Sequence, residues 1–152
     1  MGEKNTILIV DDFEFNRTIL GDLFPDYTII EAENGEQAVL KYEEHKDEIC
    51  AVLSDLMMPK MDGFQLLDYF YNTKYVEKVP VFIISADSST KAFAKAFDKG
   101  AQDVITKPFN SKFVRRRIEN IIELFRLREI VNNMGDDEDL GDEDFLDDDE
   151  LE

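Results

Sequence analysis

The sequence is short of basic residues and almost free of cysteine. Its 152 residues hold 17 Lys and Arg against 35 Asp and Glu, a net charge of −18. A nucleic-acid-binding surface neutralises phosphates with clustered Lys and Arg, so this balance argues against nucleic acid as a partner. The single cysteine, Cys50, excludes an internal disulfide and is typical of a reducing compartment. Because Cys50 lies in an apolar run, we interpret it as a small buried hydrophobic side chain.

Long apolar segments are missing as well. No segment reaches the ~20 apolar residues of a membrane span, and the N-terminus shows no apolar stretch typical of a signal peptide. We therefore expect a cytoplasmic protein that makes no contact with a membrane. The composition, 43% hydrophobic and 11% aromatic, is still sufficient for a core and excludes a wholly disordered chain.

The acidic surplus is concentrated at one end of the chain. Residues 136–152 hold 12 acidic and no basic side chains, whereas residues 1–135 hold 23 acidic and 17 basic ones, a net charge of −6. Such a run repels itself and has little apolar area, so we predict that residues 135–152 form a disordered acidic tail. Two interpretations stay open: a solubilising tail, or a segment that folds on a basic groove through its few apolar residues.

Short apolar runs alternate with amphipathic segments in the rest of the chain. Five runs have the length of a buried strand, namely residues 6–10, 27–30, 51–54, 79–85 and 103–106. The apolar stripes predicted on the helices between them are Phe15, Ile19, Leu20 and Leu23; Ala38, Val39 and Tyr42; Phe64, Leu67, Phe70 and Tyr71; and Phe93, Ala94 and Phe97. We expect Asp62 to cap the third of these helices and Gly100 to end the fourth. Alternation of this kind predicts a doubly wound α/β fold with five parallel strands and helices on both faces.

The last amphipathic segment, residues 111–134, is longer than the sheet requires. At ~1.5 Å per residue, a helix of this length spans ~36 Å. The stripe predicted to cover the sheet is Phe113, Val114, Ile118, Ile121, Ile122 and Phe125, and a second stripe is Leu124, Leu127, Val131 and Met134. We interpret residues 126–134 either as a frayed extension or as a linker helix towards a partner, a second protomer or an output domain. Gly135 is the predicted end of this helix.

Polar side chains of a few types follow the predicted strands. Asp11 and Asp12 follow the first strand, Asp55 the third, Ser85 ends the fourth and Lys107 follows the fifth. In doubly wound sheets the functional crevice lies beyond the carboxyl ends of the strands. Three carboxylates together repel one another unless a cation intervenes, and oxygen ligands suit Mg²⁺. Asp55 is the candidate nucleophile, because carboxylates form acyl phosphates, while Lys107 and Ser85 can contact phosphoryl oxygens.

Five motifs of the sequence carry a resemblance to a known family. They are Ile-Leu-Ile-Val-Asp-Asp at 7–12, Glu-Asn-Gly-Glu-Gln-Ala at 33–38, Ser-Asp-Leu-Met-Met-Pro-Lys-Met-Asp-Gly at 54–63, Ile-Ile-Ser-Ala at 83–86 and Lys-Gly-Ala-Gln-Asp-Val-Ile-Thr-Lys-Pro-Phe at 99–109. In this order and spacing they are highly specific. Through them the chain resembles the CheY-like receiver domain of two-component response regulators over roughly residues 4–125. The resemblance implies a flavodoxin-like (βα)5 fold.

The resemblance also implies a role for each residue of the candidate site. Asp55 matches the phospho-acceptor, Asp12 a direct Mg²⁺ ligand and Asp11 the acid that holds metal-bound water. Met57 matches the residue whose backbone carbonyl binds the metal, so its side chain is not a ligand. Lys107 matches the lysine that contacts the phosphoryl group.

Five positions correspond to parts of the family's switch or to positions that tune the phosphoryl group. Ser85 matches the switch hydroxyl, and Pro108 the proline whose preceding peptide bond is usually cis. Met57 and Asp87 match positions that tune the lifetime of the phosphoryl group. Val104 departs from the Tyr or Phe found in many receivers, so the aromatic half of the switch is missing. Either output depends more on the loop after the fourth strand, or Val104 only fills space.

We therefore predict a receiver, residues 1–125, that accepts a phosphoryl group on Asp55 from a sensor histidine kinase or phosphotransfer protein. Phosphorylation would switch an interaction surface for a downstream protein target or an output domain, with homodimer formation as one outcome. Residues 126–134 would serve as a linker or in dimerisation. We expect phosphotransfer and autodephosphorylation chemistry but no turnover enzyme. The alternative is a receiver-like scaffold that binds independently of phosphorylation. A hydrolase with an aspartate nucleophile is disfavoured, because its Asp-x-Asp motif after the first strand is missing.

Overall fold

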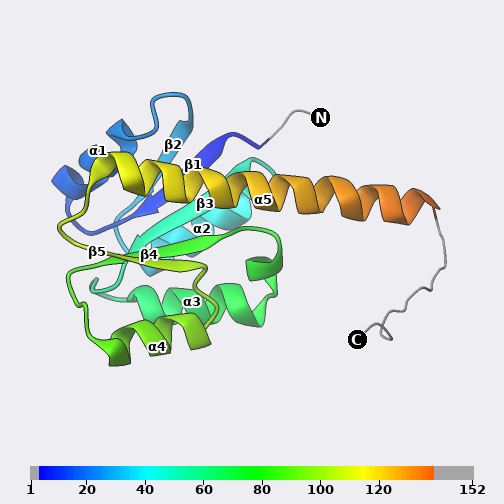
Figure 1. Cartoon of the computed structure of the whole chain (residues 1–152). Helices are drawn as coiled ribbons and strands as arrows, with labels where there is room; N and C mark the ends of the chain where they lie inside the picture. Colours follow the sequence, from blue (N-terminus) through cyan, green and yellow to red (C-terminus); the bar gives the residue numbers. More distant parts are fainter. Residues whose placement is uncertain (1–3, 139–152) are drawn as a thin grey trace.

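The computed structural model describes residues 4–138 and shows one parallel sheet between two layers of helices (Figure 1). The strands are β1 (Thr6–Val10), β2 (Thr28–Ala32), β3 (Ile49–Asp55), β4 (Val81–Ser85) and β5 (Asp103–Thr106). The helices are α1 (Glu14–Asp22), α2 (Gly35–His45), α3 (Gly63–Asn72), α4 (Thr90–Asp98) and α5 (Ser111–Glu138), with a 3₁₀ turn η1 (Tyr75–Glu77) after α3. The strand order is β2-β1-β3-β4-β5. The predicted doubly wound, flavodoxin-like α/β fold is confirmed.

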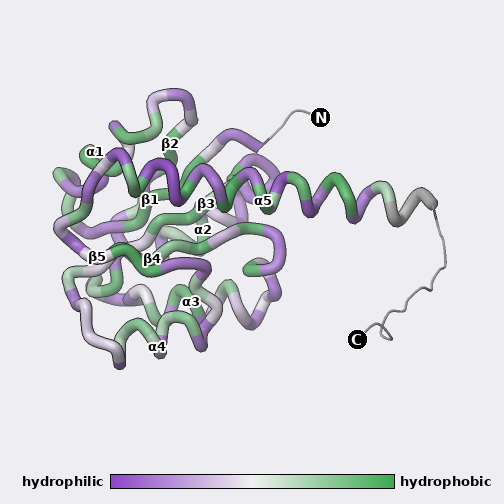
Figure 2. The backbone as a smooth tube through the Cα atoms, in the orientation of Figure 1, coloured by the Kyte–Doolittle hydropathy of each residue, from purple (hydrophilic) through white to green (hydrophobic). Residues whose placement is uncertain are grey.

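Successive strand residues face opposite sides of the sheet and enter two separate cores. Leu8 and Val10 of β1 pack in a cluster with α2, α3 and α4, whereas Ile7 and Ile9 pack with α1 and α5. The strands therefore read as continuous apolar runs, as expected for a parallel sheet covered on both faces. Figure 2 shows this as hydrophobic colour along the central strands, with mixed colouring on the helices.

The edge strand β2 begins and ends later than predicted. The predicted run stops at Ile30 because Glu31 interrupts the apolar pattern, yet β2 continues to Ala32. Glu31 lies on the edge strand, where its carboxylate pairs with Arg17 of α1 at 2.6 Å. A polar residue is accommodated here because an edge strand is only partly buried. β3 is likewise longer than predicted, and β4 begins two residues later.

Several residues of the predicted apolar stripes are exposed. They are Phe15 (74%), Ile19 (39%), Tyr71 (56%), Phe97 (46%) and Phe113 (63%). In α1 Leu20 is buried as predicted, the other buried residue of the helix is Arg17, and Phe24 follows just after the helix. Arg17 is buried because its guanidinium donates to the Glu31 carboxylate and to the Asp11 carbonyl oxygen. The buried side of α1 therefore includes the charged Arg17, whereas the apolar Phe15 and Ile19 are exposed.

Two of the three residues predicted to begin or end a helix do so. Asp62 caps α3: its Oδ1 accepts from Gln65 N–H at 2.9 Å, and Gln65 Oε1 accepts from Asp62 N–H at 2.9 Å. Gly100 follows α4 with φ +103°, the left-handed conformation that suits a helix end. The prediction for Gly135 is wrong, because α5 continues through it to Glu138. A glycine weakens a helix interior but does not by itself stop a helix.

Two further expectations concern the ends of the molecule. Most of the predicted acidic tail, residues 135–152, lies outside the described residues, and its disorder stays a prediction. Among residues 4–138, none of the helices has the length and apolarity that crossing a bilayer would require.

Candidate functional site

The carboxyl ends of four strands meet at one edge of the sheet. β1 pairs with β3, β3 with β4 and β4 with β5, all in parallel. In this register Val10 lies beside Ser54, and Ser85 lies beside Thr106. The residues that follow Val10, Ser54 and Thr106 therefore lie along the same edge as Ser85. These are the positions at which the sequence predicts a site.

Three carboxylates form the centre of this edge. Oxygen atoms of Asp11, Asp12 and Asp55 all lie within 4.8 Å of one another. Asp11 is 1% exposed, and its Oδ1 accepts from the backbone N–H of Phe13 at 3.0 Å and from the Asn16 amide at 3.4 Å. These contacts hold Asp11 in one orientation and leave its Oδ2 on the side of Lys107.

Lys107 is the cation that the structure places against these acids. Its Nζ lies 3.7 Å from Oδ2 of Asp11 and 3.7 Å from Oδ1 of Asp55. The backbone N–H of Lys107 donates to the Ser85 carbonyl oxygen at 2.8 Å, which ties the end of β5 to the end of β4. The peptide bond between Lys107 and Pro108 is cis, as the resemblance implies.

Asp55 occupies an unfavourable position for a lone carboxylate. Burial raises the pKa of Asp55, and the negative charges of Asp11 and Asp12 raise it further. The Lys107 ammonium and a hydrogen bond from the Leu56 N–H to Oδ1, at 2.8 Å, oppose this effect. The net shift of the Asp55 pKa is upward, with burial as its largest cause.

The donor set fits Mg²⁺. With all four groups ionised, three carboxylates and one ammonium leave a charge of −2, which one divalent cation neutralises. All available donors are oxygens, the ligands that Mg²⁺ takes. Asp11, Asp12 and Asp55 could therefore hold the ion. Met57, whose side chain is 71% exposed, follows Asp55 in the loop, and the role of its backbone carbonyl stays a prediction.

Ser85 connects this edge to α4 through a chain of hydrogen bonds. Ser85 is 2% exposed, and its Oγ accepts from the Asp87 N–H at 2.9 Å. The Asp87 carboxylate accepts from the Ser89 N–H at 2.9 Å, and Ser89 Oγ caps α4 by accepting from the Ala92 N–H at 3.1 Å. A displacement of the Ser85 hydroxyl would therefore be transmitted to the first turn of α4.

Comparison with known families identifies this arrangement. Residues 7–119 match the family model described as the response regulator receiver domain. The chain belongs to the response regulator receiver family.

Two relatives of known name share the receiver sequence. The receiver is 38% identical over 119 residues to the chemotaxis protein CheY of Listeria monocytogenes, which covers 74% of this chain and 94% of that protein. It is 36% identical over 122 residues to histidine kinase P4 of Formosa agariphila, which covers 80% of this chain. The chain spans 9% of the length of that kinase.

Solved structures agree with this assignment. One is the complex of CheX, CheY, BeF3 and Mg from Borrelia burgdorferi, with a TM-score of 0.71, 33% identity and coverage of 79% of this chain and 90% of that one. A second is the signal receiver domain of a LuxO repressor protein from Vibrio parahaemolyticus, with a TM-score of 0.76. It covers 84% of this chain and 97% of its own, and at 23% identity it supports the fold alone.

Val104 of this receiver is buried at the contact between β5 and α4. It is 7% exposed and packs in the same core cluster as Ala96 and Ala101. Valine has one stiff rotor and no ring. No aromatic ring can therefore swing inward at this position. The hydrogen-bond chain from Ser85 to α4 is present.

The Asp87 carboxylate is hydrogen-bonded within its own loop. Its carboxylate accepts hydrogen bonds from Ser89, which hold the pKa of Asp87 below its usual range. An ionised Asp87 in this position organises the loop before α4. The tuning roles predicted for Asp87 and Met57 stay predictions.

Two residues of the receiver site are not evident from charge or spacing. Arg17 fixes the backbone of Asp11 through the bond from Nη1 to the Asp11 carbonyl oxygen at 2.9 Å. Gly63 donates its N–H to the Leu56 carbonyl oxygen at 2.8 Å and leaves room for the end of β3. A Cβ at this glycine would lie 2.6 Å from the Asp55 carbonyl oxygen. The Asp-Gly pair at 62–63 is the signal that could have indicated Gly63.

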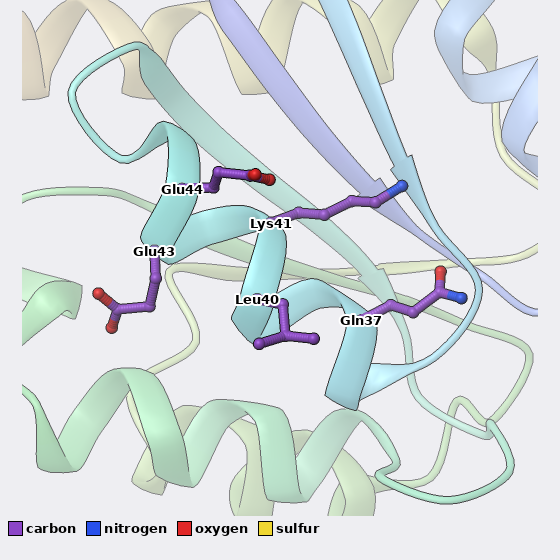
Figure 3. A pocket seen from close by; sticks show the side chains of 5 residues that line it. All are labelled: Gln37, Leu40, Lys41, Glu43 and Glu44. Atoms are coloured by element: carbon purple, nitrogen blue, oxygen red, sulfur yellow. The ribbon is translucent and has the colours of Figure 1, made fainter.

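A hollow on the surface of α2 does not belong to the receiver site. It has a volume of about 690 Å³ and is lined by Gln37, Leu40, Lys41, Glu43 and Glu44. Figure 3 shows that all five side chains come from one helix and spread away from one another. Lys41 donates to the Glu31 carbonyl oxygen at 2.6 Å, and Glu43 accepts from Tyr75. These polar groups stabilise the packing of α2 against its neighbours.

Proposed function

We propose that this receiver accepts a phosphoryl group on Asp55 from the phosphohistidine of a sensor histidine kinase or phosphotransfer protein. The observation that carries the proposal is the group of three carboxylates within 4.8 Å, with Lys107 Nζ 3.7 Å from two of them. Such a group gives a partly buried nucleophile, a site for Mg²⁺ and a cation for phosphoryl oxygens in one place. The histidine kinase among its relatives supports the class of donor.

The nucleophile is a carboxylate oxygen of Asp55. Oδ1 is engaged by the Leu56 N–H and faces Lys107, so Oδ2 is the oxygen that attacks phosphorus. The new bond is P–O, the bond that breaks is the P–N bond of phosphohistidine, and its electron pair stays on the imidazole nitrogen. Lys107 stabilises the charge on the equatorial oxygens during this in-line transfer.

Asp11, Asp12, Asp55 and the Met57 carbonyl would hold Mg²⁺. When bound, the ion supplies positive charge that draws the phosphoryl oxygens into the site and screens them from the carboxylates. The Borrelia burgdorferi CheY in complex with BeF3 and Mg supports this assignment. Asp11 is held by Phe13 and Asn16, so the chain fixes one acid of the set in advance.

The output of phosphorylation is a change in the surface around α4. The Ser85 hydroxyl donates to a phosphoryl oxygen and moves towards it, and Asp87 and Ser89 transmit this displacement to the N-terminus of α4. A downstream protein target or an output domain would recognise the changed surface. The domain catalyses its own phosphotransfer and dephosphorylation and is not a turnover enzyme. Its single, buried cysteine suits the cytoplasm.

Acetyl phosphate with Mg²⁺ tests the proposal directly. Intact-protein mass spectrometry should show the gain of one phosphoryl group in the wild type and no gain in Asp55→Asn. Asp98→Asn, an exposed acid on α4, is the matched control and should gain the group as the wild type does. Absence of any mass gain with several small phosphodonors and with a histidine phosphotransfer protein would refute the proposal. Equal binding of a target by the wild type and Asp55→Asn would favour the phosphorylation-independent scaffold.

A further inference from the structure

α5 carries two apolar stripes on opposite sides. The first, Val114, Ile118, Ile122 and Phe125, is buried against the sheet at exposures of 0–8%. The second is Leu124 (40%), Leu127 (50%), Val131 (64%) and Met134 (59%). At 3.6 residues per turn, the centres of the two stripes lie roughly 150° apart around the helix. The body of the same molecule cannot cover the second stripe, which we call the outer stripe.

The part of α5 that carries the outer stripe projects beyond the body. Up to Met134, the last side chain whose burial is described, Phe125 is the final buried residue, and every residue from Leu127 to Met134 is exposed. Figure 1 shows α5 continuing well past the sheet, and Figure 2 shows hydrophobic colour along the projecting part. The packed part of α5 already provides the helix nucleus, so what the projecting part lacks is burial of its apolar side chains.

The spacing of the outer stripe matches a two-stranded coiled coil. Steps of 3, 4 and 3 residues place Leu124 and Val131 at a positions and Leu127 and Met134 at d positions. Val131 at a and Leu127 at d are the combination of a β-branched residue and a leucine that favours two parallel strands. Ile130, 48% exposed, broadens the stripe at the neighbouring g position.

The charges beside the stripe are complementary to a second copy of this chain. Glu123 stands at g and Arg128 at the following e position, five residues later. In a parallel pair, Glu123 of each copy faces the partner's Arg128, which gives two opposite-charge contacts. In an antiparallel pair g faces g′ and e faces e′, so Glu123 would no longer face the Arg128 position and both opposite-charge contacts would be lost. The acidic segment 139–152 has no basic side chain to pair with Glu123, whereas a second copy of α5 offers Arg128.

We propose that residues 124–134 pair with the same segment of a second copy in a parallel, two-stranded helical contact. The contact is isologous, since one surface patch meets itself around a two-fold axis. It needs neither phosphorylation nor the strand-end site, so it is independent of the proposed function. Both receiver bodies would lie at the same end of the helical pair.

Sedimentation equilibrium of the full chain without phosphodonor tests the proposal. The mass of the wild type should rise with concentration from 17.6 kDa towards twice that value. Leu127→Lys should remain at 17.6 kDa, whereas Glu129→Lys, outside the stripe at an f position, should associate like the wild type. A wild type that stays monomeric at every concentration, or a Leu127→Lys variant that associates equally, overturns the proposal. A far-ultraviolet circular dichroism spectrum and a cooperative urea transition like those of the wild type show that the monomeric variant is folded.

A charge exchange tests the parallel orientation. Glu123→Lys and Arg128→Glu should each raise the dimer dissociation constant by about tenfold, since each converts two opposite-charge contacts into like-charge ones. The double variant should restore it. Rescue is required because Glu123 also contacts Arg126 and the Arg128 guanidinium lies 4.8 Å from the Phe125 ring centroid. A double variant as weak as the single ones overturns the parallel pairing.

Discussion

Replacing Gly63 by alanine tests whether the absence of a side chain at this position places Asp55, the proposed phospho-acceptor. The added Cβ would lie 2.6 Å from the Asp55 carbonyl oxygen and 2.8 Å from Leu56 Cα. Ordinary contacts begin at 3.4 Å, so either the end of β3 or the start of α3 must move by about 0.8 Å. Both contacted atoms belong to the backbone, so no side chain can rotate out of the way.

The expected cost follows from this overlap. Overpacking a well-filled site costs about 1–3 kcal/mol, and the gain in helix propensity from Gly to Ala recovers only a small part of this, because Gly63 is the first residue of α3. We therefore expect Gly63→Ala to lower the free energy of unfolding by roughly 1–2 kcal/mol, or the melting temperature by about 2–8 °C. Mg²⁺ affinity should fall too, because the displaced carbonyl belongs to Asp55. Urea unfolding and a Mg²⁺ titration measure the two effects.

Gly21→Ala is the matched control. A Cβ at Gly21 would meet Ile29 at 3.7 Å, an ordinary contact, and the residue lies within α1. This variant should be stabilised by ~0.5–1 kcal/mol and should bind Mg²⁺ like the wild type. If Gly63→Ala proved as stable as Gly21→Ala, with unchanged Mg²⁺ affinity, the steric reasoning would be refuted.

Three further predictions concern the metal, the lifetime of the phosphoryl group and the cysteine. Mg²⁺ should raise the melting temperature of the wild type, by an amount equivalent to ~2.7 kcal/mol at 100 times its dissociation constant. Asp12→Asn should lose most of this gain in thermal scans with and without EDTA. Met57→Asn should speed the loss of phosphate from Asp55, because an amide can orient attacking water and a thioether cannot; an unchanged or slower rate of phosphate release counts against this. Burial raises the pKa of the Cys50 thiol from 9.0 to about 11. The folded state therefore holds the proton more tightly, so this contribution to stability is complete below pH 9 and is lost as the pH rises through 11. A thiol reagent at pH 8 should label Cys50 only upon unfolding in urea, and rapid labelling of the folded protein would contradict the burial.

The strand-end residues are the part of the site that sequence predicts best. Asp11, Asp55 and Lys107 follow apolar runs, and a parallel sheet brings the carboxyl ends of its strands to one edge. The distances of 3.7 Å from Lys107 to both acids agree with that reasoning. The contributions of Arg17 and Gly63 are not predictable in this way. Arg17 acts through a backbone carbonyl, and Gly63 acts through the space that it leaves.

The orientation of the helices is predicted less well, for a physical reason. Periodicity detects an amphipathic helix, but it locates the buried side only when the exposed side is polar. Phe15 and Phe113 are apolar and exposed, and Arg17 is buried with its polar atoms bonded. The outer stripe of α5 shows the same ambiguity, because a surface that suits a second chain has the composition of a core.

The distribution of the site over β1, β3, β4 and β5 has a consequence for synthesis of the chain. The first acid is Asp11 and the last cation is Lys107, and β4 and β5 must pair before Lys107 reaches the acids. A nascent chain that has not yet exposed residue 107 outside the ribosome holds the acids without their ammonium. The complete group of three acids and one ammonium therefore forms only after residue 107 has emerged and β5 has paired with β4.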